Sequence, residues 1–339
     1  MSKLRILGKA EVESVLTMPM AIEAVEQAYL QKQRGQASVW PLLFHDFAED
    51  PLTDMDLKSG NLDGDGVWGY KAISCYTGNR AKGLPVYHGL MNLWDRETGE
   101  PRAILNAGPI TNYRTGAAAA VGAKYLARQH ATRALVCGTG GLAPYIGAAL
   151  ICALPRLEAI TYVNPRHPDA AAQELPRIAG DVRHLLTATG IDPVPALLAS
   201  DDLEAGVGQA DVVVTATPAT QPYLRAEWVR PGTHLSCMGS DKSGKQEIEG
   251  ACFSHARAIC DDTVQVMNVG ECEMAHKQGF LEKPDAEIGA VIAGEAEGRQ
   301  SAGQITIFDS TGLALQDLAS ASRIVARAEK DGIGTVVDL

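Results

Sequence analysis

The sequence lacks any apolar run long enough to cross a membrane. None of its 339 residues belongs to a stretch that approaches the roughly 18 uninterrupted apolar residues of a membrane helix. The basic N-terminus, Met1–Leu7, has no apolar core and no cleavage site, so we expect no signal peptide. Positive charge is scarce as well, with 30 Lys and Arg against 41 Asp and Glu. The net charge of −11 argues against nucleic acid or an anionic membrane as a partner.

Paired cysteines are also missing. The seven cysteines are scattered, form no C-x-x-C motif and lie mostly in apolar runs. This is typical of reduced thiols that pack as small hydrophobic residues in a cytoplasmic protein. Cys272 lies among possible metal ligands in the segment from Gly270 to His276, but the spacing fits no standard zinc site. We therefore predict a cytoplasmic protein without a metal, whose partners are small molecules.

The sequence does contain a strand, a glycine turn and a helix in succession. A short apolar run, 134–137, leads into Gly138, Gly140 and Ala143 at G-x-G-x-x-A spacing, and a run rich in Ala, Ile and Leu follows. In dinucleotide-binding folds the first glycine permits a tight turn and the second lets the pyrophosphate approach the backbone. The small third residue keeps the helix near the sheet, and the helix N-terminus attracts the phosphates. A glycine turn in an unrelated α/β domain is the alternative.

The residue that would read the cofactor ribose follows the next predicted strand, which ends at Val163. An acidic residue at this place is usual in NAD-specific sites. Here it is Asn164, followed shortly by Arg166. Asn164 does not repel a 2′-phosphate and Arg166 could pair with one, which favours NADP(H). The alternative is that Arg166 is a solvated loop residue.

The chain divides into two parts with different periodicity, as its length suggests. For the first part we predict an antiparallel meander with a loop at 50–66. We also predict two helices there, one that begins after Thr17 as its N-cap and ends at Gly35, and one that begins near Arg114 and ends near 128. Its strands are predicted at 4–7, 39–47, 67–76, 83–94 and 102–106. The second part alternates strands and helices, which indicates a doubly wound parallel sheet. Its strands are predicted at 134–137, 158–163, 212–216, 234–237, 258–260 and 305–308, with helices that include 144–154, 170–187 and 313–327.

Three charged residues lie where charge needs an explanation. In a strand that alternates between two faces, Lys71 lies on the same face as apolar neighbours. A lysine there needs a partner of opposite charge or a functional role, unless it extends to solvent at a sheet edge. Arg114 lies near the predicted start of a helix, where the dipole opposes a cation and a nearby anion would be favourable; an ordinary surface arginine is the alternative. Asp241 follows the strand at 234–237 in a polar loop at the carboxyl edge of the sheet, where chemistry is expected. It could equally be a turn aspartate.

Six motifs in order resemble the ornithine cyclodeaminase/mu-crystallin family over nearly the whole chain. They are Gly69-Tyr-Lys71 with Asn79 and Gly83-Leu-Pro85; Ile110-Thr-x-x-Arg114-Thr-Gly-Ala-Ala; the glycine loop 138–143; Thr215-Ala-Thr; Gly239-x-Asp241-x-x-Gly-Lys245-x-Glu247; and Phe308-x-Ser310-x-Gly312-x-Ala-x-x-Asp317-Leu-Ala.

The resemblance implies a Rossmann NAD(P)-binding domain at 129–312. It also implies an α+β substrate-binding and dimerisation domain at 1–128 and 313–339, to which the last helix returns. Members of the family bind NAD(P)(H), act on α-amino acids or their imines, and form homodimers. By the resemblance Lys71 and Arg114 handle the substrate carboxylate and reacting centre, and Asp241 is the acid/base residue. The cofactor would contact Thr115, Gly138, Thr139, Gly140, Gly141, Leu142, Ala143, Asn164, Arg166, Thr215, Ala216, Thr217, Met238, Gly239 and Ser310.

Three departures from the family pattern bear on substrate and cofactor. Leu142 replaces the usual glutamine of the glycine loop, which removes one polar contact and leaves the phosphate geometry. An arginine usual after a proline in the early sheet is missing after Pro41, and Lys58 is a possible substitute. His88 is a polar residue within an apolar strand, which we interpret as a hydrogen-bonded core histidine, with substrate contact as the alternative.

The chemistry of these residue types agrees with an oxidoreductase acting on a C–N bond. A hydride passes between Cα and the nicotinamide while the nitrogen gains or loses a proton, which requires a carboxylate within reach. An arginine fork fixes the substrate carboxylate, and a lysine stabilises developing charge. The sequence favours an imine reductase or amino-acid dehydrogenase. The alternatives are an ornithine cyclodeaminase that recycles bound NAD and a non-catalytic NADP-binding protein.

Overall fold

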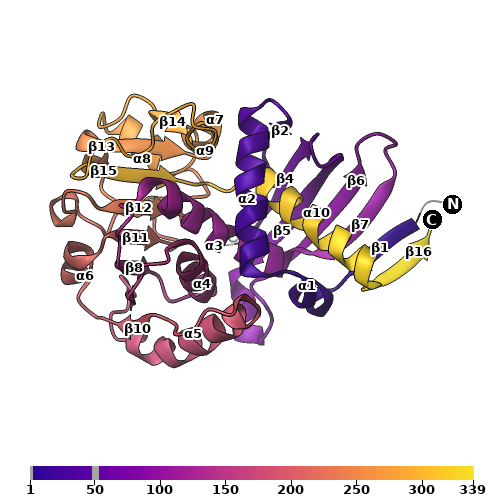
Figure 1. Ribbon diagram of the computed structural model, residues 1–339, viewed down its shortest axis with the longest axis horizontal. Coiled ribbons are helices and arrows are strands. Elements are labelled where there is room, and N and C mark those ends of the chain that lie inside the picture. The colour runs from indigo at the N-terminus through magenta and orange to yellow at the C-terminus, as the bar shows by residue number, and fades with distance from the viewer. Residues whose placement is uncertain (1–2, 48–52) are drawn as a thin grey trace. The chain divides into compact units, whose positions relative to one another are not determined.

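The computed structural model describes residues 3–47 and 53–339, which form two compact units (Figure 1). Unit 1 consists of Met1–Arg114 and Leu313–Leu339, and unit 2 of Thr115–Gly312. The boundary between Arg114 and Thr115 lies inside helix α3 (Ala107–Leu126), which begins in unit 1 and ends in unit 2. The domain bounds expected from the sequence, with a boundary at residue 128, stay a prediction. No helix of the described residues is long and apolar enough to cross a membrane.

Unit 1 is built on an eight-stranded sheet that is antiparallel except where β1 pairs with β7. The order is β16-β1-β7-β6-β5-β4-β2, and β3 also pairs with β4. The strands are β1 (Lys3–Leu7), β2 (Ala37–Val39), β3 (Leu43–Asp46), β4 (Thr53–Leu62), β5 (Val67–Tyr76), β6 (Tyr87–Asp95), β7 (Pro101–Asn106) and β16 (Thr335–Asp338). The meander predicted for the first part of the chain is therefore present.

Two predictions for this sheet were wrong in detail. The single strand expected at 39–47 is split into β2 and β3, and the loop expected at 50–66 contains the ten-residue strand β4, with 48–52 outside the described residues. β4 pairs with β5 along its whole length and with β2 and β3 on its other edge. This pairing outweighs the low strand propensity of the Asp and Gly residues that suggested a loop.

Helices α1 (Lys9–Val15), α2 (Met18–Gln33) and α10 (Ala314–Asp331) belong to unit 1, where α10 packs on α2 and across β4 and β5 (Figure 1). Thr17 caps α2 as predicted, because its hydroxyl accepts a hydrogen bond from the Met20 N–H at 3.4 Å. A Cβ on Gly69 would lie only 3.1 Å from Leu318 of α10 and 2.1 Å from the Asn92 carbonyl. Glycine is therefore required where α10 crosses the sheet.

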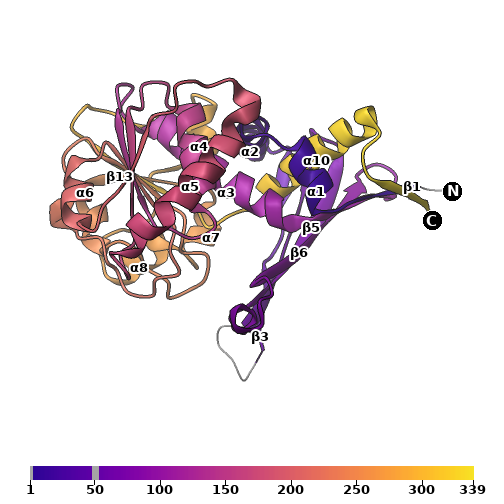
Figure 2. The same cartoon turned by 90° about the horizontal axis from the view of Figure 1, so that it is seen from below.

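Helix α10 lies along one face of this sheet (Figure 2), and the opposite face carries exposed apolar side chains. Trp68 of β5 stacks between Trp40 and Trp94, with ring centroids 6.0 and 5.0 Å apart. Leu90 on the same face is 53% exposed. His88 lies two residues before Leu90 and is exposed, so its interpretation as a core histidine was wrong. Alternation along β6 places both residues on this face, away from the buried Met91 and Leu93.

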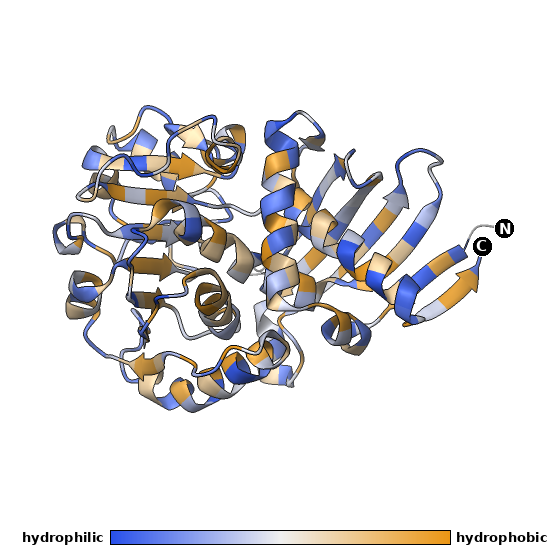
Figure 3. Cartoon of the chain, in the orientation of Figure 1, coloured by the Kyte–Doolittle hydropathy of each residue, from blue (hydrophilic) through white to orange (hydrophobic). Residues whose placement is uncertain are grey.

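Unit 2 is a parallel eight-stranded sheet of order β10-β9-β8-β11-β12-β15-β13-β14, as predicted for a doubly wound fold. Its strands are β8 (Arg133–Cys137), β9 (Ala159–Val163), β10 (Ala196–Ala199), β11 (Val212–Thr215), β12 (His234–Cys237), β13 (Ala256–Cys260), β14 (Ala286–Glu287) and β15 (Ile305–Asp309). Its further helices are α4 (Ala143–Ala153), α5 (Ala170–Leu186), α6 (Leu203–Gln209), α7 (Thr263–Val266), α8 (Glu271–Lys277) and α9 (Ile288–Ile292). Strands β8 and β11 are apolar along most of their length (Figure 3), as strands buried on both faces must be. Strand order reverses between them, and their carboxyl ends form the usual cofactor site of this fold.

Candidate active site

Three of the expected substrate residues come together in unit 1. Lys58 of β4 and Lys71 of β5 are direct cross-strand partners. Lys71 is only 2% exposed and lies on the face that α10 covers. Arg114 of α3 is 7% exposed and shares a hydrogen-bond partner with Lys71. The lysine that the sequence placed on an apolar face is therefore buried in a cluster of charges and is not at a solvent-exposed sheet edge.

The anion of this cluster is Asp317 of α10, which the sequence reasoning did not assign to the site. The Nζ of Lys71 donates to both carboxylate oxygens of Asp317 at 3.1 Å, and the Nε of Arg114 donates to Oδ1 at 3.2 Å. Asp317 is fully buried. A sequence signal existed, because the residue is an acid among the apolar residues Leu315 and Leu318 of an amphipathic helix.

Arg114 lies in the middle of a helix and not near its start. Helix α3 begins at Ala107, so the dipole argument for a neighbouring anion does not apply, although an anion is indeed present. The Nη1 of Arg114 also donates to the side-chain oxygen of Gln316 at 3.2 Å, and the amide of Gln316 donates to the Tyr29 hydroxyl of α2. Residues from α2, α3 and α10 thus hold the guanidinium in one orientation.

Burial lowers the pKa of Lys71 from 10.5 to about 8, although Asp317 raises it; the neighbouring Arg114 and Lys58 lower it further. Burial alone would raise the pKa of Asp317, but the charges of Lys71 and Arg114 bring it below its usual value. Asp317 therefore stays ionised at neutral pH. Lys71 changes its charge within the range in which many enzymes work.

The charges of the cluster favour an anionic ligand. Lys58, Lys71 and Arg114 carry three positive charges, and Asp56 and Asp317, the acids that act on Lys71, carry two negative ones. The three cations lie close together in a buried place, where charged groups need compensation by groups of opposite charge. The carboxylate of a small substrate is an anion of the kind that such a group of cations binds.

In unit 2 the glycine loop has the shape that a pyrophosphate requires. Gly138 has φ +124°, and a Cβ there would lie 2.7 Å from the Ala216 carbonyl. Cβ atoms on Gly140 and Gly141 would meet nothing within 4 Å, so the backbone is open there. Leu142 at the start of α4 supplies no side-chain cap to the first N–H groups. The loop therefore suits a dinucleotide for two reasons. The pyrophosphate can approach its open backbone, and the N-terminus of α4 follows with unsatisfied N–H groups that attract phosphates.

Asn164 follows β9 at the place expected for the ribose-reading residue. Its amide donates to the Thr139 hydroxyl at 2.9 Å, and its oxygen accepts from the backbone N–H groups of Arg166 and His167 at 3.1 and 3.0 Å. The side chain of Arg166 is exposed, and the guanidinium of Arg177 donates to the Thr139 carbonyl at 2.9 Å. Asn164 thus ties the glycine loop to the turn that carries Arg166.

Glu247, a second acid that the sequence reasoning left without a role, joins the ends of β11 and β12. Its oxygens accept hydrogen bonds from the Thr215 hydroxyl, from the Thr217 N–H and hydroxyl (2.7 Å each), from the Tyr223 hydroxyl (3.0 Å) and from the Gly239 N–H (2.9 Å). Burial raises its pKa, and the bonds from Thr215 and Thr217 oppose this. The threonine hydroxyls predicted to contact cofactor are thus directed to Glu247.

The remaining expected residues also lie in unit 2. The carboxylate of Asp241 is 54% exposed and accepts from the Nζ of Lys245 at 2.5 Å. The Ser310 hydroxyl, expected at the cofactor, donates to Asp261 at 3.0 Å. Thr115 and Met238 are buried. The expected substrate residues thus belong to unit 1, while Asp241 and the expected cofactor residues belong to unit 2; their cofactor contacts stay predictions.

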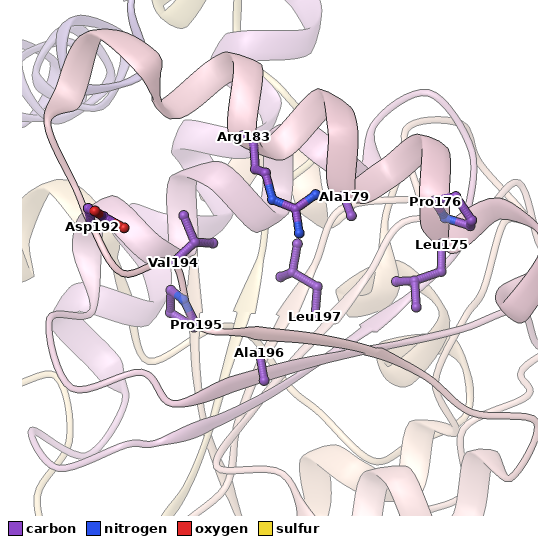
Figure 4. A pocket seen from close by; sticks show the side chains of 9 residues that line it. All are labelled: Leu175, Pro176, Ala179, Arg183, Asp192, Val194, Pro195, Ala196 and Leu197. Atoms are coloured by element: carbon purple, nitrogen blue, oxygen red, sulfur yellow. The ribbon is translucent and has the colours of Figure 1, made fainter.

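A cavity of about 720 Å³ lies in unit 2 between α5 and the edge strand β10 (Figure 4). Leu175, Ala179 and Arg183 of α5 face Val194, Pro195 and Leu197 across it. None of the expected site residues lines this cavity. It is therefore separate from the candidate site.

Comparison with known proteins shows the family to which the chain belongs. Residues 3–332 match the ornithine cyclodeaminase/mu-crystallin family. Alanine dehydrogenase of Archaeoglobus fulgidus is 35% identical over 334 residues, which cover 98% of this chain and 97% of that protein. A solved archaeal alanine dehydrogenase dimer with bound NAD has TM-score 0.87 and 33% identity and covers 100% of both chains. The Δ1-pyrroline-2-carboxylate reductase of Thermococcus litoralis, solved with NADH and L-proline, has TM-score 0.88 and 25% identity and covers 98% of this chain and 99% of that one. The chain belongs to the ornithine cyclodeaminase/mu-crystallin family.

Proposed function

We propose that this protein is an NAD(P)-dependent oxidoreductase that interconverts an α-imino acid and the corresponding α-amino acid. The observation that carries the proposal is the buried cluster of Lys58, Lys71 and Arg114, which brings three cationic side chains together in a place that suits a substrate carboxylate. Similar proteins of the family are an alanine dehydrogenase and a reductase of a cyclic imine. Both act at a carbon that carries a nitrogen and a carboxylate.

The chain's own residues would orient the substrate and move the proton. Arg114, held by Asp317 and Gln316, would bind the carboxylate through its remaining N–H groups, with Lys58 as a second cation. Lys71 in its cationic form would stabilise charge that develops at the reacting centre. Asp241 would give the nitrogen its proton, or take it in the reverse direction. The nicotinamide, when bound, supplies or accepts the hydride.

For the cofactor, we propose a preference for NADP(H). Asn164 brings no negative charge to the ribose end, and the exposed Arg166 is a cation that suits a 2′-phosphate. The related structures contain NAD or NADH. Equal kcat/KM with NADH and NADPH, or a higher value with NADH, would contradict this preference.

The exposed face of the unit 1 sheet suggests a homodimer. The stacked rings of Trp40, Trp68 and Trp94, together with Leu90, form an apolar patch of the kind that marks protein interfaces. The related archaeal alanine dehydrogenase is a dimer. We propose a second copy of this chain as the partner of this face.

Oxidation of NADH and of NADPH at the reduced-nicotinamide absorbance band tests the activity. The substrates are pyruvate or oxaloacetate with ammonia, pyruvate with methylamine, and preformed cyclic imines, with ammonia release from L-ornithine and NAD measured in parallel. We expect consumption of reduced cofactor with at least one imine. Asp241→Asn should lower kcat by on the order of 10² or more while the Kd of the cofactor stays unchanged.

Two results would overturn the proposal. Ammonia release from ornithine with no net change in cofactor would establish a cyclodeaminase. Cofactor binding without turnover of any substrate would favour a binding protein. Normal turnover by Asp241→Asn would leave the activity in place and remove only Asp241 from the mechanism.

A further inference from the structure

The loop that carries Asp241 has little structure of its own. It runs from the end of β12 to Ile248 without a helix or strand, and it contains Gly239 and Gly244, the latter with φ +83°. Asp241 itself is exposed and bonds to Lys245 within the same loop. A loop of this composition would sample many conformations unless other elements restrain it.

Helix α8 restrains this loop through two carboxylates. Glu273 accepts a hydrogen bond from the Ser243 hydroxyl at 2.5 Å and one from the Gly244 N–H at 3.3 Å. Its side chain is only 4% exposed, although it also pairs with Lys277 at 2.5 Å. Burial opposes the ionised form, but Lys277 and Ser243 bring the pKa of Glu273 below its usual value, so it is a carboxylate at neutral pH.

Glu271 contacts the same loop before and after the residues that bond to Glu273. Its carboxyl group accepts from the Ser240 hydroxyl at 2.6 Å and from the N–H groups of Glu247 and Ile248 at 2.7 and 3.3 Å. The two acids of α8 therefore bind the residues before Asp241 and those after it.

The start of α8 is itself fixed to the sheet. The Cys272 N–H donates to Asp309 at the end of β15 at 2.8 Å. Gly270 precedes the helix at φ +110°, where a Cβ would lie 2.9 Å from the same carboxylate. The segment 270–276, which resembled a set of metal ligands, thus has its two glutamates engaged with the loop and not directed to a common point.

We propose that Glu271 and Glu273 are positioning residues that fix the Asp241 loop in its working conformation. Asp241 must meet the substrate nitrogen within hydrogen-bond distance, and small displacements of such a group reduce the rate strongly. A loop ordered in advance avoids the entropy cost of ordering it in each turnover. The inference depends on the proposed role of Asp241 as acid/base.

The test compares Glu273→Gln with Lys277→Gln in the full-length protein. The amide NH₂ of glutamine cannot accept, so Glu273→Gln loses either the bond from Ser243 or that from Gly244. Lys277 touches the same carboxylate without touching the loop, so Lys277→Gln is the matched control. We expect Glu273→Gln to lower kcat about tenfold or more at unchanged cofactor Kd, and Lys277→Gln to keep kcat within about twofold. Ser243→Ala, which removes the loop's donor and leaves α8 intact, should reproduce part of the loss.

The Asp241→Asn background separates this inference from the proposed function. If Glu273 acts through Asp241, Glu273→Gln should cause no further loss in an enzyme that already lacks the carboxylate. A full additional loss there, or equal losses in Glu273→Gln and Lys277→Gln, would show that Glu273 supports the fold only. Wild-type kcat in Glu273→Gln, with Asp241→Asn impaired, would refute the inference and leave the proposed function intact. Wild-type activity of Asp241→Asn itself would refute the role of Asp241.

Discussion

Replacement of Asp317 by asparagine should destabilise unit 1 far more than loss of an ordinary ion pair. The substitution keeps the shape of the side chain but removes the one carboxylate that bonds to both Lys71 and Arg114 in the buried cluster. Removal of one partner of a buried pair costs about 3–5 kcal/mol, because the remaining charge is left without compensation. With an m-value of about 2–3 kcal/mol/M, the urea midpoint should fall by about 1–2.5 M.

Asp331→Asn is the matched control on the same helix. Asp331 pairs with Arg327 at the surface, where such a pair contributes about 0–1 kcal/mol. Tryptophan fluorescence is the suitable signal, since Trp40, Trp68 and Trp94 all lie in unit 1 and Trp228 alone lies in unit 2. A midpoint in Asp317→Asn no lower than in Asp331→Asn would refute the assignment of Asp317 as the counter-ion.

The pH of this measurement matters because the pKa of Asp317 is lowered in the folded state. Its contribution to stability is therefore present above its usual pKa of 3.8 and is lost as the pH falls below that value. The difference between Asp317→Asn and the wild type should be full at pH 7 and should shrink under acid conditions. A difference that does not depend on pH down to the acid limit would indicate a loss of packing and not of charge.

Three further predictions concern Lys71, the glycine loop and the exposed face of the unit 1 sheet. Because the pKa of Lys71 lies at about 8, turnover that needs its cation should fall as the pH rises through that value. Lys71→Arg, which stays charged, should have lower kcat but no such fall in a pH profile; a persisting fall would assign it to another group. Gly140→Val should weaken cofactor binding by on the order of 10² (about 2.7 kcal/mol) in a nicotinamide fluorescence titration, with Tm unchanged because a Cβ meets nothing there. Leu90→Glu should convert the proposed dimer to a monomer in light scattering; an unchanged mass would place the interface elsewhere.

The fold was predictable where the sequence pattern of a segment matches the environment of that segment in the folded protein. Strands such as β8 and β11 are apolar runs because both of their faces are buried, and the glycine loop between β8 and α4 is recognisable from its spacing. Strand β4 was missed because it contains acidic residues and glycine, and its pairing with β5 on one edge and with β2 and β3 on the other makes it a strand. Its polar residues include Lys58, which contributes to the charged cluster.

The candidate site was predictable only in part, because several of its contacts join distant segments. Lys71 and Arg114 were found from their residue types and surroundings, whereas their common partner Asp317 lies 246 residues after Lys71 and 203 after Arg114 in the chain. Glu247 and Glu271 bind mostly backbone N–H groups and hydroxyls, which leave no pattern in a sequence. Such contacts become visible only when the fold brings the segments together.

The discontinuity of unit 1 has a consequence for how the chain folds during synthesis. Unit 2 is one uninterrupted segment, Thr115–Gly312, and can acquire its contacts as soon as that segment leaves the ribosome. All strands of the unit 1 sheet except β16 are translated before unit 2, yet the helix that covers the sheet and pairs with Lys71 is made after it. Until α10 emerges and completes the core, Lys71 therefore lacks Asp317 and the apolar face that α10 covers stays exposed.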